Sequence, residues 1–223
     1  MTEFDLNTDS VRALNQHLHD SPSGSLSVVN PGGRHCIASC IDASFAVSID
    51  GHVGYYCAGM NKKAQVTITG NAGPGVAENI MSGSVRIKGS ASQYAGASGQ
   101  GGTLIIEGDA SARCGISMNG VDIVVTGSVG HMSAFMGQKG RLVICGDAGD
   151  FLGDSLYEAL IYVRGSVGEL GADCVEKEMT ADHVQSLKDL LASVGVDASA
   201  EDFRRYGSAR KLYNFNIDHA DDY

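Results

Sequence analysis

Aromatic and basic residues are scarce in this chain. It has no tryptophan and only three prolines in 223 residues, and aromatic residues make up 6% of it. Sixteen Lys and Arg stand against 26 Asp and Glu, which gives a formal net charge of −10. Nucleic-acid binding depends on Lys and Arg that neutralise phosphates, so we expect no nucleic-acid partner. No apolar run approaches the ~18 residues of a membrane span, and the N-terminus MTEFDLNTDS is no signal peptide. These absences predict a cytoplasmic protein without membrane contact.

The cysteine and histidine patterns also lack the spacing of a metal site. Neither Cys-x-x-Cys nor His-Glu-x-x-His occurs, and a four-cysteine zinc or iron–sulfur site needs tighter clustering. Without secretory features the thiols are expected to be reduced and structural. The six cysteines are Cys36, Cys40, Cys57, Cys114, Cys145 and Cys174.

Glycine, in contrast, is abundant, and seven of the 30 glycines recur every nineteen residues. Aliphatic residues recur four and two positions before each of them, and a small or branched apolar residue recurs two positions after. We call each set of equivalent residues a column. A fixed period of this kind indicates a repeat architecture. The glycine column consists of Gly51, Gly70, Gly89, Gly108, Gly127, Gly146 and Gly165.

Each repeat predicts one β-strand, because apolar residues alternate with others around the column glycine and glycines interrupt every helical window. We therefore predict an all-β fold, a parallel β-helix of seven coils of 19 residues, occupying residues 26–175. A left-handed β-helix is built from hexapeptides, yet Ile49 is followed six and twelve residues later by Tyr55 and Asn61. This mismatch favours the right-handed form. In this fold the column glycines mark a bend where φ is positive or where tight packing excludes a Cβ atom.

The N-terminal part, residues 1–25, is predicted to hold a helix within residues 3–20. Asp9 or Ser10 is expected to cap it, and Val11, Leu14 and Leu18 form one apolar face. Residues 26–45 read as a degenerate first coil, in which Gly32 precedes the first column glycine by nineteen residues.

The C-terminal part, residues 176–223, is predicted to hold two helices. The first runs from Thr180 to Val194 and ends at Gly195; the second covers about 200–206, between a Ser199 cap and Gly207. The apolar segment that follows should pack on a partner chain or back on the rod. The predicted interface residues are Lys211, Leu212, Tyr213 and Phe215.

The repeat register also tests candidate catalytic groups. Asp154 and Asp173 share a column in adjacent coils, and the ~4.8 Å strand spacing places them near the separation that glycosidases use. No Arg or Lys shares that column, and no aromatic residues are placed to stack a sugar, so we favour two solvated loop residues. No glycine-rich phosphate loop opens a helix. We predict no catalytic, cofactor-binding or metal-binding residue on this chain.

One further column is polar in every repeat, which predicts an exposed polar ladder directly after the glycines. It holds His52, Asn71, Ser90, Asp109, Ser128, Asp147 and Ser166.

Several motifs resemble a known family. The pattern Gly51-x-x-Gly54-x4-Gly59, and coils such as residues 66–73 (VTITGNAG), are similar to the GXGXG domain, the right-handed β-helix at the C-terminal end of the large chain of glutamate synthase. The resemblance extends to residues 4–6 (FDL), 12–15 (RALN), 30–35 (NPGGRH) and 210–213 (RKLY), and so to nearly the whole chain. As a free-standing chain it looks most like the glutamate-synthase-like subunit of N-methylglutamate synthase.

The resemblance implies a non-catalytic, structural subunit of a hetero-oligomer. Its expected partners are a class II glutamine amidotransferase-like subunit and an FMN-binding, glutamate synthase-like subunit that also carries an iron–sulfur cluster. No family catalytic residue can be carried over, because the family places none in this domain. The corresponding subunit of a split glutamate synthase and the formylmethanofuran dehydrogenase subunit that shares the repeat remain alternatives, as does, more distantly, an independent polysaccharide-active β-helix enzyme.

Overall fold

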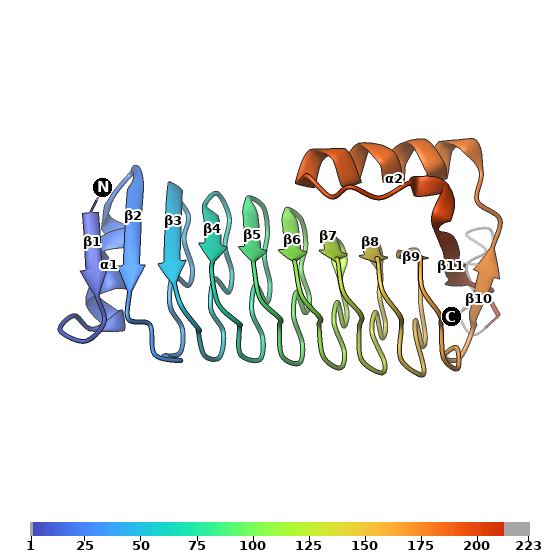
Figure 1. The fold of residues 1–223 in the computed structure, drawn as a ribbon, viewed down its shortest axis with the longest axis horizontal. Coiled ribbons are helices and arrows are strands. Elements are labelled where there is room, and N and C mark those ends of the chain that lie inside the picture. The colour runs from blue at the N-terminus through green and yellow to red at the C-terminus, as the bar shows by residue number, and fades with distance from the viewer. Residues whose placement is uncertain (1, 212–223) are drawn as a thin grey trace, which may run out of the picture.

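The computed structural model describes residues 2–211, which form one sheet of eleven strands flanked by two α-helices. Figure 1 shows the coils stacked in a row, with α1 at the N-terminal end and α2 alongside the C-terminal half. The sheet order is β1-β2-β3-β4-β5-β6-β7-β8-β9-β11-β10. The strands are β1 (Thr2–Asp5), β2 (Ser23–Val29), β3 (Ser44–Asp50), β4 (Gln65–Ile68), β5 (Ser84–Ile87), β6 (Thr103–Ile106), β7 (Asn119–Val125), β8 (Lys139–Ile144), β9 (Leu160–Val163), β10 (Cys174–Lys177) and β11 (Arg204–Ser208).

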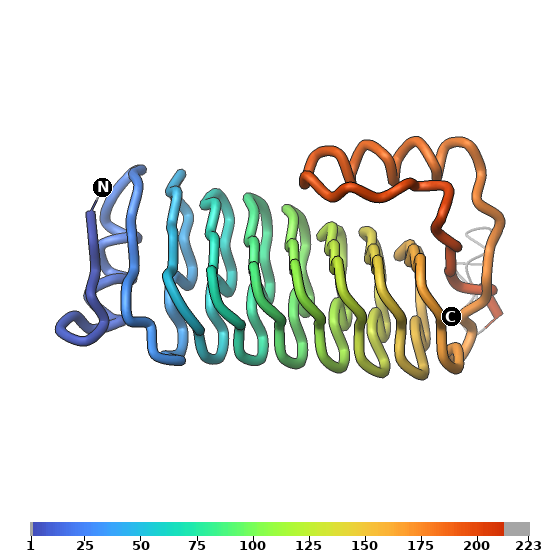
Figure 2. Tube along the Cα trace, in the orientation of Figure 1, coloured from blue at the N-terminus to red at the C-terminus, as the bar shows by residue number. Residues whose placement is uncertain are grey.

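The nineteen-residue register is confirmed by the pairing of strands β3 to β9, all of which run parallel. Val47 pairs with Val66, Val66 with Val85, and the same offset continues to Ile161. The aliphatic columns point into the rod and are buried, as Ile68 and Ile87 illustrate with no exposed surface. The tube trace in Figure 2 follows this repeat from coil to coil. The predicted parallel β-helix of seven coils is therefore the fold of the chain.

The glycine column is a site of close backbone contact rather than of unusual dihedral angles. Only its first member, Gly51, has a positive φ, of 129°. At Gly70 an added Cβ atom would lie 2.5 Å from the carbonyl carbon and oxygen of Gly51, and Gly146 stands in the same relation to Gly127, at 2.7 Å. Each glycine thus lies directly against the glycine of the preceding coil, which leaves no room for a side chain.

The polar column after the glycines forms a continuous ladder of hydrogen bonds. Asn71 Oδ1 accepts from the backbone N–H of Ser90 at 2.9 Å, and Asp109 Oδ1 accepts from that of Ser128 at 2.8 Å. The same contact joins every adjacent pair from His52 to Ser166. A short side chain with an acceptor atom is required at each rung, which explains why the column is polar throughout.

The N-terminal end is closed by α1 (Val11–Asp20), whose Leu14 and Leu18 are fully buried against the first coils. Ser10 is the N-cap, with its Oγ accepting from the N–H of Ala13 at 3.1 Å. Residues 3–5, which lie in the range predicted for the helix, belong instead to strand β1, which pairs with β2.

The degenerate first coil has a different offset from the predicted one. Leu26 pairs with Val47 and Val28 with Ile49, so the offset is 21 residues and not nineteen. The predicted alignment of Gly32 with Gly51 is therefore wrong, because two additional residues in this coil keep the aliphatic columns in line.

The C-terminal end differs more from the sequence-based prediction. Helix α2 (Ala181–Val194) ends at Gly195, whose φ is 70°, as predicted. The second predicted helix is wrong: a single 3-10 turn, Ala200–Asp202, leads into β11. Strand β11 lies antiparallel between β9 and β10, where its hydrogen bonds to both neighbours stabilise the extended form over a helix.

Candidate interaction surface

One side of each coil has an unusual backbone. The fifth, seventh and ninth residues after the column glycine adopt the left-handed (αL) conformation, as in Tyr56 (φ 59°), Ala58 (φ 53°) and Met60 (φ 55°). The same three positions have positive φ in each of the six coils from residue 51 to residue 155. Their N–H groups donate alternately to the following and preceding coils: Tyr56 to Pro74, Ala58 to Ile37 and Met60 to Glu78, all within 2.9 Å. These bonds between coils hold the αL residues in place.

The seventh position faces inward and holds only Ala or Gly, whereas the fifth and ninth positions face outward. Ala58, Ala77 and Ala134 have no exposed surface. We call the outward residues of coils one to six the αL face. In its first column it comprises Tyr56, Gly75, Tyr94, Arg113, Met132 and Phe151, and in its second Met60, Asn79, Ser98, Ser117, Met136 and Ser155.

Six of the twelve αL-face residues are aromatic or Met, the others are Gly75, Asn79, Arg113 and three serines, and the Glu78 carboxylate lies against Gly75. Phe151, Met60 and Met136 are 46%, 38% and 37% exposed, and Tyr55, beside the first column, is 48% exposed. Among the twelve residues Arg113 is the one charged side chain, although the whole chain carries 42 formally charged residues, 16 basic and 26 acidic. Aromatic residues, Met and Arg are enriched, and other charges depleted, in the cores of protein interfaces.

The side chains on this face are retained at a cost to the backbone. An αL conformation costs an L-residue roughly 1–2 kcal/mol relative to the right-handed region, and glycine avoids the cost. The chain uses glycine freely elsewhere, yet only Gly75 of the twelve αL-face positions is glycine. The inward αL position also keeps Ala in three coils, Ala58, Ala77 and Ala134, so the hydrogen bonds between coils offset this cost on both faces.

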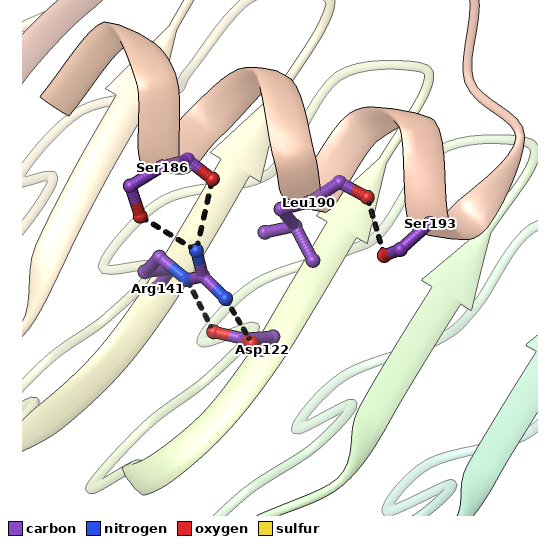
Figure 3. A network of polar contacts seen from close by, with 5 residues as sticks. All are labelled: Asp122, Arg141, Ser186, Leu190 and Ser193. Atoms are coloured by element: carbon purple, nitrogen blue, oxygen red, sulfur yellow. Dashed lines mark hydrogen bonds and ion pairs between the residues drawn. The ribbon is translucent and has the colours of Figure 1, made fainter. Parts of the chain in front are cut away.

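The strand side of the rod is occupied by α2. The outward residues of the last strands are apolar there and form a second core with the helix, through Leu187, Leu190, Leu191 and Val194. Arg141 fixes the helix in register: its Nη1 donates to the carbonyl oxygen of Ser186 at 3.1 Å and to Ser186 Oγ at 2.9 Å, and its Nε and Nη2 donate to Asp122 (Figure 3). The ion pair with Asp122 raises the pKa of Arg141 further.

Two open hollows, of about 500 and 530 Å3, flank α2. Each hollow contains one ion pair, Arg86 with Glu107 at 2.8 Å and Arg141 with Asp122 at 2.5 Å, and Arg164, Asp182, Asp189 and Asp197 also line them. In both hollows the paired arginine also donates to a carbonyl of α2, Arg86 to Val194 and Arg141 to Ser186, so these ion pairs help to hold the helix.

The two candidate carboxylates, Asp154 and Asp173, do not share the column in which the repeat register placed them. The last coil is one residue short, because Leu152 pairs with Leu170, and this shift moves Asp173 out of the column of Asp154. Asp154 accepts hydrogen bonds from Ser155 Oγ and the N–H of Ala172. Asp173 accepts from Ser208 Oγ, at 2.5 Å, and from the N–H of Lys211. Both carboxylates therefore bind the chain itself at the C-terminal end of the rod.

Four of the six cysteines are buried, as predicted for structural thiols, whereas Cys36 is half-buried and Cys40 is exposed. Cys57 and Cys114 are fully buried, and all six cysteines are free. Burial raises the pKa of Cys114 to about 12 and raises that of Cys57 as well, which keeps both thiols protonated and unreactive. Within residues 2–211, no three His, Cys, Asp or Glu side chains lie close enough to hold a metal ion. No helix in the same range is long and apolar enough to cross a bilayer.

Comparison with known proteins identifies a full-length relative. Protein GlxC of Rhizobium meliloti (strain 1021) is 60% identical to this chain over 228 residues, and the match covers 100% of both chains. This chain belongs to the GlxC family. No protein-family model matches it, and no solved structure does.

The predicted interface residues of this GlxC-family chain lie at the end of the described range. The N–H of Lys211 donates to Asp173 Oδ1 at 3.0 Å, while Leu212, Tyr213 and Phe215 lie outside residues 2–211. The turn at residues 208–211 is thus part of the folded end of the rod.

Sequence reasoning missed the surface beneath α2, although a signal was present. The residue three before the column glycine is Ser48, Thr67 and Arg86 in the first coils, and it then becomes apolar. The later members of this column are Ile105, Val124, Val143 and Tyr162, all buried. An outward column that changes from polar to apolar along a rod predicts that a covering element begins there. Sequence reasoning also missed the αL face, for which Tyr, Met and Phe recurring at fixed distances after the glycines were the available signal.

Proposed function

We propose that this chain is a structural, non-catalytic subunit of a multi-subunit, FMN-dependent, glutamate-synthase-like enzyme that makes N-methylglutamate from glutamate and methylamine. In this proposal the rod holds an amidotransferase-like subunit and an FMN- and iron–sulfur-binding subunit together. The cofactors belong to the second of these partners. The GXGXG-like coils and the flanking motifs support the assignment, and the β-helix that the resemblance implies is the fold of the chain.

The structural role is supported by the surroundings of the carboxylates and thiols that could otherwise act in catalysis. Asp154 and Asp173 accept hydrogen bonds from the chain's own N–H and hydroxyl groups. Cys57 and Cys114 are sealed inside the rod with raised pKa values. These side chains are committed to the fold, and the surface that remains is suited to binding other chains.

Native co-purification with mass spectrometry tests the proposal. We expect an amidotransferase-like chain and an FMN-binding chain to accompany this subunit, and the complex to form N-methylglutamate from glutamate and methylamine. Glutamine as the effective nitrogen donor would instead identify a split glutamate synthase. Purification without either partner would overturn the proposal.

The C-terminal segment offers a second, local test. We propose that Lys211, Leu212, Tyr213 and Phe215 touch a partner chain, so truncation after residue 211 should weaken assembly of the complex. The truncation leaves the Ser208–Asp173 anchor intact, so the unfolding midpoint of the isolated chain serves as its control. A complex that assembles equally well without residues 212–223 would refute this assignment.

A further inference from the structure

The last described residues form a turn at the C-terminal end of the rod, directly after strand β11. Figure 1 places this end, with β10 and β11, opposite the end that α1 closes. Strand β11 is fixed before the turn begins, because it pairs with β9 on one side and with β10 on the other. The turn is therefore not needed to complete the sheet.

Asp173, the residue before β10, makes three hydrogen bonds to this turn, one through each of its oxygen atoms. Its carbonyl oxygen accepts from the N–H of Ala209 at 2.7 Å. Its Oδ1 accepts from the N–H of Lys211 at 3.0 Å, and its Oδ2 accepts from Ser208 Oγ. Ser208 Oγ in turn accepts from the N–H of Arg210 at 2.9 Å. One residue of the last coil thus holds the backbone of the whole turn.

A second carboxylate, that of Glu158, holds the side chain of the same turn. Arg210 Nη2 donates to both carboxylate oxygens of Glu158, at 2.7 and 2.8 Å. Both side chains are more than half exposed, and ion pairs of this kind contribute little to stability. Since Glu158 belongs to the sixth coil and Asp173 to the seventh, the turn is tied to the last two coils of the rod.

The residues held in this way do not belong to the hydrophobic core. Ala209 is partly exposed, and Arg210 and Lys211 are exposed. Ordering such a turn costs conformational entropy and gains no hydrophobic stabilisation. What the ordered turn does provide is a fixed point from which the following residues leave the rod. Preorganisation of this kind lowers the entropy cost of binding.

The fixed turn also limits where the segment after it can make contact. Phe215, the last of the residues proposed above to touch a partner chain, follows Lys211 by four positions. Four residues span at most ~14 Å when fully extended, whereas seven coils at the strand spacing make the rod about 34 Å long. The contact must therefore lie at the C-terminal end, where Leu170 and Val175 are each 36% exposed.

We propose that Asp173 is a positioning residue for partner binding, which clamps the turn so that the segment after Lys211 leaves the rod towards a partner chain docked at its C-terminal end. Glu158 is the second anchor of the clamp. This inference rests on the contact between residues 212–215 and a partner chain proposed above. It adds which residue directs the segment and at which end of the rod that partner lies.

Reconstitution with the partner chains separated from the native complex tests the clamp. Asp173→Gly removes the carboxylate and keeps the αL backbone, since Asp173 has a φ of 64° and glycine adopts that conformation without strain. We expect the dissociation constant of the full chain to rise about 10-fold, because the segment must then be ordered on binding. In a chain that ends at Lys211 the same variant should have no effect. Asp173→Asn, which keeps one acceptor oxygen, should restore part of the affinity.

Asp109→Asn is the matched control, because it neutralises a carboxylate in the middle of the rod. Asparagine can accept from the N–H of Ser128 as Asn71 does from that of Ser90, so the dissociation constant should not change. An equal loss with and without residues 212–223 would show that Asp173 acts through the fold of the rod, and would overturn the proposal. So would wild-type affinity of the full-length Asp173→Gly chain. A truncation without effect would refute the docking segment and this inference with it, while the co-purification test of the structural subunit would be unaffected.

Photo-crosslinking tests the location of the partner. A benzophenone side chain placed at Tyr213 and, in a separate chain, at Val175 should capture the same partner chain in the complex. Arg12, exposed on α1, is the matching position at the far end of the rod. Capture of that partner from Arg12 and not from Val175 would place the contact at the wrong end and overturn the proposal.

Discussion

Replacing one glycine of the column should destabilise the rod by an amount that follows from its contacts. A Cβ atom added at Gly127 would lie 2.7 Å from the carbonyl oxygen of Gly108 and 2.9 Å from its carbonyl carbon. It would lie closer still to Asp109 Oδ1, which accepts a hydrogen bond from the N–H of Ser128 at 2.8 Å. The preceding coil must therefore move, and the ladder bond beside it must lengthen or break.

The cost of Gly127→Ala follows from these terms. Overpacking costs typically ~1–3 kcal/mol, and loss of the Asp109–Ser128 hydrogen bond adds about 1 kcal/mol. Against this, φ at Gly127 lies outside the left-handed region, so alanine gains roughly 0.4–1 kcal/mol through the unfolded chain. We expect a net loss of about 2–3 kcal/mol, or a fall in Tm of roughly 4–12 °C for a domain of this size.

Guanidinium chloride unfolding followed by far-UV circular dichroism measures this change, and Gly207→Ala is the matched control. At Gly207 the nearest atom to an added Cβ is Lys177 Cγ at 3.8 Å, so the control should lie within about 0.5 kcal/mol of the wild type or slightly above it. If Gly127→Ala is as stable as the control, contact between coils does not determine the glycine column.

Three further changes test other parts of the rod. Tyr162→Phe should leave the stability unchanged or raise it by about 1 kcal/mol, because Tyr162 Oη is buried without a hydrogen-bond partner among the described residues; a clear loss in urea unfolding would reveal a partner. Arg141→Leu should lower the free energy of unfolding by about 1–2 kcal/mol and increase hydrogen exchange selectively in α2, since it breaks the contacts to Asp122 and Ser186. A uniform increase in exchange would show that Arg141 does not hold α2 in place. The unfolding free energy should fall as the pH rises from about 9 towards 12, because burial raises the pKa of the folded Cys114 thiol from 9.0 to about 12. Cys114→Ala should reduce that slope, and an unchanged slope would contradict the assignment.

The repeat itself could be predicted because every coil imposes the same constraints at the same spacing. Val66 and Ile68 face inward, Gly70 packs against Gly51, and Asn71 bonds to the next coil, so each column shows its role seven times over. Repetition thus turns a weak local preference into a clear pattern. The end of α2 at Gly195 was also predictable, from a single local glycine signal.

The predictions failed where the sequence does not repeat and where contacts between distant residues determine the structure. Residues 204–208 have helix-compatible residues, but pairing with both β9 and β10 makes them a strand. The short last coil, visible in the pairing of Leu152 with Leu170, brings Gly171 against the backbone of Asp154, and no change in the glycine spacing announces it. The αL side was missed because Tyr56 and Met60 have no propensity for that conformation, which is stabilised by hydrogen bonds to neighbouring coils.

The division of the coil into sides explains how one rod can serve several contacts. Its stability rests on inward columns, the glycine column and backbone ladders, which are the same in every coil. The outward columns do not make these stabilising contacts. Their residues can therefore vary along the rod with whatever packs against them. The strand side becomes apolar from Ile105 onward, where α2 covers it, while the αL face keeps Tyr56, Met132 and Phe151 exposed or partly exposed despite the cost to their backbones. The inward αL residues Ala58, Ala77 and Ala134 bear the same cost without any exposed side chain, so the hydrogen bonds between coils, and not the surface, keep this backbone in place.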